Sequence, residues 1–248
     1  MQVLALRLLA QARDAGALKR FYGDLLALAP VREAEGAAFL AGESVLTFDP
    51  VEDARPFYHI ALRVPRNRFH ALHGALARRS ALLSDPLSAA TVFEFRSWNA
   101  LACYLHDPCG SIVELITHLD LGDEAPGEPE APVRGDVLGI CEVGLVGEDT
   151  RAMANALADL GIGLWDGTVD VPGRLGFAGG PQGTLILAPS GRGWVPTGRP
   201  AEVHPVDVTV AGGEERDVSL PGTPHVVRVR RTPAAATGTA RHDTGPAA

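Results

Sequence analysis

Two stretches of the chain combine the pattern of buried β-strands with residues that are costly to bury: YHIALRVP (58–65) and YLHDPCGSIVELITH (104–118). Each contains a continuous apolar run of strand length, which is typical of a strand that is covered on both faces. The first run carries His59 and the second carries Glu114. A carboxylate buried without a partner is strongly unfavourable, so we expect Glu114 to be protonated, paired or bound to a metal ion.

The elements around these two strands repeat along the chain. A first unit has a strand pattern at residues 2–9, apolar residues at helical spacing over 14–28, and three further short strand patterns. The same order of one strand, one helix and three strands returns in a second unit over residues 58–118. A third, less regular unit begins at ICEVGLVG (140–147) and ends at TLILAP (184–189). Repetition at this length predicts a fold built of βαβββ units.

The repeats predict an α+β protein with four parts. We expect residues 1–119 to form a domain of two paired βαβββ units, and residues 133–231 to form a degenerate third unit with extra strands. The segment 120–132 is rich in Pro and acidic residues, which is typical of a linker. The tail 232–248 lacks apolar periodicity and is predicted to be disordered.

The overall composition limits the kinds of partner that the protein can bind and the compartment in which it is expected. The net charge of −8 argues against nucleic acid, because phosphate binding requires a basic surface. No apolar run approaches the length that spans a bilayer, and the N-terminal segment has the pattern of a strand and lacks the marks of a signal peptide. Three cysteines are too few for a disulfide framework. Together these features predict a cytoplasmic protein.

The order of elements and three landmarks resemble the vicinal oxygen chelate superfamily, which includes glyoxalase I, extradiol dioxygenases, and fosfomycin and bleomycin resistance proteins. The landmarks are FYGDLLAL (21–28), YHIALRVP (58–65) and YLHDPCGSIVELI (104–116). The resemblance covers residues 1–119 fully and residues 137–190 more weakly. It implies that two units curl into a curved mixed sheet, with a divalent metal ion such as Fe, Mn, Zn or Ni on its concave face.

The resemblance implies a metal ligand on the first and on the last strand of each unit. It assigns His59 and Glu114 to these roles in the second unit. The first unit should offer ligands near residues 3–7 and 46–47, but the residues there are poor metal ligands. Two protein ligands fall short of the three that are typical of catalytic zinc. A structural hydrogen bond between His59 and Glu114 is therefore the alternative.

In the third unit, Glu142 occupies the position of His59, and Leu187 stands where Glu114 would be. Glu142 would be a third ligand only if the second and third units shared one curved sheet and its concave face. We expect the first and second units to pair instead, which makes Glu142 a polar residue of a degenerate copy.

Two aromatic residues complete the predicted site. Tyr104 is a candidate general acid or hydrogen-bond donor, with a core aromatic as the alternative. Trp98 is a candidate for lining a substrate pocket, with packing of a hairpin as the alternative. Trp194 is expected to cover the edge of the third unit.

These features favour a divalent-metal-dependent enzyme, dioxygenase-like or glyoxalase-like, that acts on a small oxygenated organic molecule. The reaction, whether a lyase, isomerase or ring-cleavage step, is left open. The alternative is a metal-free small-molecule-binding or resistance-type protein, which the missing ligands of the first unit favour. A homodimer, with residues 133–231 at its interface, is compatible with both hypotheses.

Overall fold

The computed structural model describes residues 1–32, 36–127 and 131–231. The predicted disordered tail (232–248) and residues 128–130 of the predicted linker therefore lie outside the described residues. Within these ranges the strands form two mixed sheets, which confirms the α+β class. No helix in the described part of the chain combines the length and the apolarity needed to cross a membrane.

The seven-stranded sheet contains the first unit and the C-terminal strands, in the order β14-β15-β13-β1-β4-β3-β2. A helical segment over residues 12–25, which includes α1 (Ala15–Leu18), lies on the first unit. The strands are β1 (Val3–Gln11), β2 (Ala29–Pro30), β3 (Ala37–Ala41), β4 (Ser44–Val51), β13 (Val206–Ala211), β14 (Arg216–Ser219) and β15 (Val226–Arg230).

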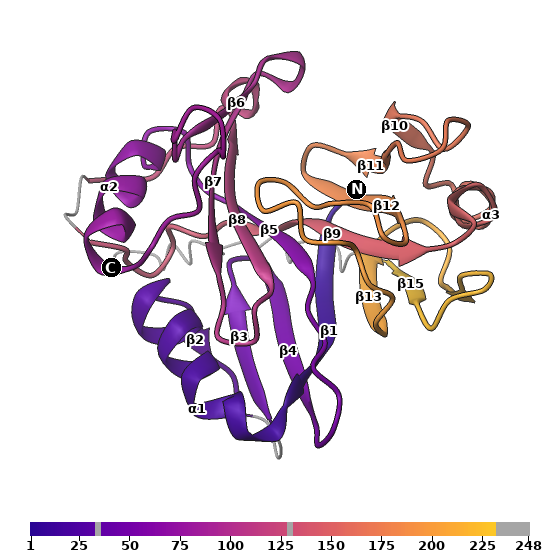
Figure 1. The fold of residues 1–248 in the computed structure, drawn as a ribbon, viewed down its shortest axis with the longest axis horizontal. Helices are drawn as coiled ribbons and strands as arrows, with labels where there is room; N and C mark the ends of the chain where they lie inside the picture. Colours follow the sequence, from indigo (N-terminus) through magenta and orange to yellow (C-terminus); the bar gives the residue numbers. More distant parts are fainter. Residues whose placement is uncertain (33–35, 128–130, 232–248) are drawn as a thin grey trace, which may run out of the picture.

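The eight-stranded sheet contains the second and third units, in the order β10-β11-β12-β9-β5-β8-β7-β6. Its helices are α2 (Phe69–Arg79) and α3 (Thr150–Ala158). The strands are β5 (His59–Arg63), β6 (Phe93–Phe95), β7 (Ala100–His106), β8 (Ile112–His118), β9 (Gly139–Gly147), β10 (Leu164–Gly167), β11 (Gly176–Gly180) and β12 (Gly183–Pro189). Helices α1 and α2 lie at one end of the molecule and α3 at the other (Figure 1).

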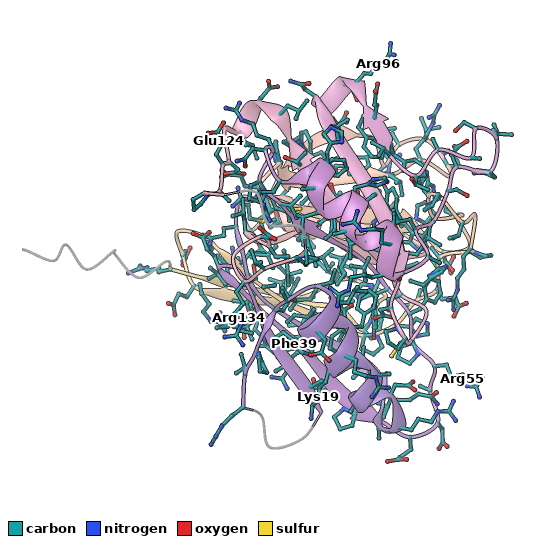
Figure 2. The ribbon with its side chains drawn as sticks, turned by 90° about the vertical axis from the view of Figure 1, so that its left-hand side faces the viewer. Lys19, Phe39, Arg55, Arg96, Glu124 and Arg134 are labelled. Carbon is teal, nitrogen blue, oxygen red and sulfur yellow. The ribbon has the colours of Figure 1, made fainter. Side chains whose placement is uncertain are left out.

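The sheet order corrects the expected pairing of the first and second units. Strand β5 pairs antiparallel with β9, so the second unit joins the third, whereas β1 pairs with β13. Residues 1–119 therefore do not share one sheet. Figure 2 shows the first and second units from the side, with Lys19 on the first unit and Arg96 at the far tip of the second unit. The predicted pairing was wrong because each unit begins with a similar apolar strand. The pattern of such a strand does not specify which other strand pairs with it.

Side chains alternate between two apolar clusters across the eight-stranded sheet. On β5, Ile60 and Leu62 point into the large cluster, which also contains side chains of the seven-stranded sheet. Ala61 points into a smaller cluster on the opposite face. Because side chains two residues apart share a face, His59 lies on this second face, and the same alternation places Glu114 of β8 there. This second face carries the candidate site.

Candidate metal centre and its pocket

A row of cross-strand partners runs over the second face of the eight-stranded sheet. Tyr104 of β7 lies opposite Glu114, Glu114 lies opposite Ala61, and Ala61 lies opposite Glu142 of β9. Paired residues project on the same side of a sheet, so the two glutamates face each other across the single methyl group of Ala61. His59, two residues before Ala61, completes the group.

Three potential ligand atoms converge at this point. The Nε2 atom of His59 lies 3.0 Å from Oε2 of Glu114, and ligand atoms of His59, Glu114 and Glu142 all lie within 4.8 Å of one another. The three residues are buried, with exposed fractions of 6%, 2% and 3%. Among the described residues, no other group of three His, Cys, Asp or Glu side chains is arranged to hold an ion.

Burial controls the charge of this cluster. It raises the pKa of Glu114 to about 8. Burial, and then repulsion from Glu114, raises the pKa of Glu142 well above its ordinary value. Burial also lowers the pKa of His59 to about 4, so this imidazole is neutral at pH 7. The two carboxylates therefore require a compensating cation before both can ionise.

The donor set fits a divalent metal ion. One neutral imidazole suits Fe, Zn and Ni, while two carboxylates add the oxygen ligands that Mn prefers. Three protein ligands are also the number typical of catalytic zinc sites, which leave a further position for water or substrate. Glu142 thus offers a third potential ligand atom, which the first unit does not.

Aromatic side chains form most of the wall around the three ligands. The rings of His59 and Trp194 meet edge-on with their centroids 4.8 Å apart, and Trp98 contacts Phe177 at 4.7 Å. The indole N–H of Trp98 donates a hydrogen bond to the carboxylate of Asp166 on β10, so this residue connects the second unit to the third. The cavity has a volume of about 70 Å³. It is lined by His59, Phe95, Trp98, Tyr104, Glu114, Glu142, Leu175, Phe177, Ile186, Arg192, Trp194 and Val195.

Tyr104 lies beside the ligands as a hydrogen-bond donor. Burial, followed by the nearby charge of Glu114, raises its pKa well above the ordinary value, so the hydroxyl keeps its proton. Glu114 is its cross-strand partner, so the hydroxyl and this carboxyl group project from the same face of the sheet. The phenol is therefore a potential donor to a candidate ligand and a poor general base.

The alignment of the third unit with the second was wrong by one residue at the last strand. In the observed register, Glu114 lies opposite Ala61, and Ile186 occupies the corresponding place opposite Gly144. Ile186 lines the pocket, whereas Leu187 points into the large cluster. A shift of one residue changes the face of a strand, so the third unit supplies one potential ligand and an apolar wall.

Trp194 lies over the middle of the eight-stranded sheet, and not over the edge of the third unit as expected. Its ring lies over β9, where a Cβ added to Gly144 would come within 2.9 Å of it. The sequences HIAL (59–62) and EVGL (142–145) both have a small residue two positions after the candidate ligand, and this signal could have indicated two faces that meet in one site. His118, at the end of β8, is also buried at 3% exposed and stacks on Trp98.

Comparisons with known proteins identify the fold. Neither a family model nor a curated protein sequence matches the chain. A solved structure described as a "putative dioxygenase" from Bacillus subtilis subsp. subtilis str. 168 is similar with a TM-score of 0.59 and 13% identity, over 94% of this chain and 86% of that one. Glyoxalase I from Zea mays is similar with a TM-score of 0.50 and 14% identity, over 92% and 91% of the two chains. The chain therefore has the vicinal oxygen chelate fold, and its chemistry has to be argued from its own residues.

Proposed function

We propose that this protein is a divalent-metal-dependent enzyme that acts on a small oxygenated organic molecule, with His59, Glu114 and Glu142 as the metal ligands. The observation that carries the proposal is the convergence of three buried ligand atoms within 4.8 Å on one sheet face. The fold adds support, because it is shared with solved structures described as a dioxygenase and as glyoxalase I. Fe, Mn, Zn and Ni are the candidate ions.

The chemistry of such a site follows from the ligand set. A bound divalent ion would act as a Lewis acid that holds two adjacent substrate oxygens and stabilises developing negative charge on them. The four candidate ions share this property, so the donor set alone leaves the reaction class open.

The chain's own residues shape the site for this chemistry. Tyr104 keeps a proton on its hydroxyl and lies opposite Glu114, so it is available as a hydrogen-bond donor to that carboxyl group. Trp194 packs against His59 and fixes the imidazole ring. Ala61 places only a methyl group between Glu114 and Glu142, and the absence of a side chain at Gly144 makes room for the Trp194 ring. The aromatic wall limits access of water, which strengthens electrostatic interactions inside.

Metal uptake tests the proposal directly. The protein is purified without a histidine tag, stripped of metal, dialysed against Mn, Fe(II), Zn or Ni, and analysed for bound metal per chain. We expect near-stoichiometric uptake of at least one ion by the wild type and loss of uptake in Glu142→Gln. Glu148→Gln is the matched control, because Glu148 is exposed just beyond the end of β9. Full uptake by Glu142→Gln would overturn the proposed ligand set.

A metal-free small-molecule-binding protein is the second candidate. The direct hydrogen bond between His59 and Glu114 favours it, because this contact satisfies one nitrogen and one oxygen without an ion. Failure of the wild type to take up any of the four metals, together with ligand binding that survives His59→Ala, would support this candidate.

The remaining expectations concern assembly and location. A small-molecule ligand is part of both candidates, whereas the homodimer and the cytoplasmic location stay predictions. Light scattering on the purified protein at several concentrations measures the oligomeric state. A mass of one chain at all concentrations would contradict the homodimer.

A further inference from the structure

Arg192 is the single arginine or lysine among the described residues that line the pocket of the candidate metal centre. It follows β12 in the turn that leads to Trp194 and is partly buried. Its guanidinium donates one hydrogen bond, from Nη1 to the carbonyl of Gly193 at 2.8 Å. A guanidinium has five N–H donors, so most of them have no partner within the described part of the chain.

The charge of Arg192 is also uncompensated. Burial lowers its pKa, and no carboxylate among the described residues acts against that shift. Arg192 lines the same cavity as the three ligands. A divalent ion would balance Glu114 and Glu142, and the guanidinium charge would then remain. The loaded pocket therefore has an excess of positive charge that favours an anionic ligand.

Arg192 lies where two cavities meet, because it lines both of them. The inner cavity of about 70 Å³ is far smaller than typical ligand pockets of ~300–1,000 Å³. A second hollow of about 460 Å³ adjoins it and shares Leu175, Phe177 and Arg192 with it. Arg174 also lines this outer hollow. An organic molecule that occupies both cavities therefore extends past Arg192.

We propose that the site takes a small organic acid whose carboxylate is held by Arg192. The oxygenated end of the acid would face the three ligands, and its apolar body would lie against Leu175 and Phe177. Arg192 is then a specificity-determining residue that selects acids over neutral molecules of the same shape. The position of the oxygenated end rests on the proposed function, whereas recognition of the carboxylate rests on Arg192 alone.

A matched pair of probes tests this inference. Binding of 3,4-dihydroxybenzoate and of its neutral analogue 3,4-dihydroxybenzamide is measured by titration calorimetry on zinc-loaded and on metal-free protein. We expect the wild type to prefer the acid at least tenfold, since a charge-assisted hydrogen-bond pair has this magnitude. Arg192→Gln should remove the preference without weakening the amide, and Arg192→Lys should keep part of it. Arg20→Gln removes the same charge from the exposed face of the first unit's helix and should change nothing.

The outcomes separate the two proposals. Equal affinity for acid and amide, no binding of the acid, or an acid preference that persists in a folded Arg192→Gln would overturn the role of Arg192. Metal uptake is measured independently on the same samples. Metal uptake without a preference for the acid would support the metal centre and refute the role of Arg192. A preference for the acid without metal uptake would refute the metal centre and support the role of Arg192.

Discussion

The two sheets of this protein are built from the same kind of unit, yet their outer faces differ in chemistry. On the seven-stranded sheet, Arg7 of β1 forms an ion pair with Asp49 of β4 at 2.5 Å, and both side chains are partly exposed. On the eight-stranded sheet, the equivalent face carries His59 and two glutamates, all buried. The strands are alike, so the difference lies in what covers them.

The cover of the eight-stranded sheet comes from segments between and after its strands. Trp98 reaches over from the turn after β6, and Trp194 and Ala201 come from the segment after β12. The ion pair of Arg7 is exposed to water, where such pairs contribute only ~0–1 kcal/mol. Under cover, unpaired charge is costly, and this cost makes a group of acidic side chains a strong site for a cation. The segments that cover a sheet, more than the sequences of its strands, therefore decide which sheet face can carry a candidate metal centre.

The largest effect in this comparison is expected at a buried ion pair of the second unit. Arg68, before α2, makes two hydrogen bonds to Asp136 at 2.9 and 3.0 Å, and both side chains are almost fully buried. Arg68→Ala leaves a buried carboxylate unpaired and should lower the free energy of unfolding by about 3–5 kcal/mol. Arg7→Ala should change it by less than about 1 kcal/mol. Urea denaturation measures both, and equal losses would contradict the contrast.

Metal-free protein should be stabilised when one buried carboxylate is removed. Glu142→Gln deletes a group whose ionisation is opposed by burial and by Glu114, so its unfolding free energy without metal should rise by about 1–3 kcal/mol. The same variant should no longer gain thermal stability from added Zn. Asp49→Asn on the other sheet should show neither effect. Thermal unfolding with and without Zn measures this, and a less stable metal-free Glu142→Gln would contradict it.

The stability of the metal-free protein should also depend on pH, because the buried groups of the cluster have shifted pKa values. The raised pKa of Glu114, about 8, means that the metal-free folded state holds its proton in a range where the unfolded state has released it, so stability falls as pH rises towards 8. The lowered pKa of His59, about 4, has the opposite effect, but that effect is complete by pH ~6.5, the unfolded value. Between pH 6.5 and 8 stability should therefore fall, by up to about 2 kcal/mol from Glu114.

Urea denaturation of metal-free protein at pH 6.5 and 8 measures this fall. Glu114→Gln should make the fall smaller, because glutamine does not titrate, and the slope that remains should come from Glu142, whose pKa burial still raises. Saturating Zn should do the same, because the ion keeps the carboxylates ionised in the folded state. A wild-type protein that is more stable at pH 8 than at 6.5 without metal would refute the charge assignment.

Local features of the fold were predictable from the sequence. Apolar periodicity indicated the repeating units, and the strands that carry His59 and Glu114 lie where the sequence places them. The fold implied by the resemblance to the vicinal oxygen chelate superfamily is confirmed by the similar solved structures. These signals are local, because side-chain alternation and turn residues act within one element.

The arrangement of the units could not be predicted in the same way. Strand β9 pairs with β5 rather than standing apart, and this choice depends on contacts between residues about eighty positions apart in the chain. Glu142 could be interpreted as a ligand only after that pairing was known. Trp194 and Arg192 lie in a segment without periodicity, so no pattern in the sequence indicates that they enter the site.

The smallest effect is expected from two buried tyrosines that each contact a carboxyl group, one in each half of the protein. Tyr22, on the helix of the first unit, lies 3.1 Å from Asp107 through its hydroxyl, whereas Tyr104 contacts Glu114. Tyr22→Phe should lower the free energy of unfolding by about 1 kcal/mol and leave metal affinity unchanged. Tyr104→Phe should lower metal affinity about tenfold, because it removes a donor that orients a ligand. Zn titration in competition with a chelator measures the affinity. Equal Zn affinities of the two variants would show that Tyr104 only packs against Glu114, and that its hydrogen bond does not position a ligand.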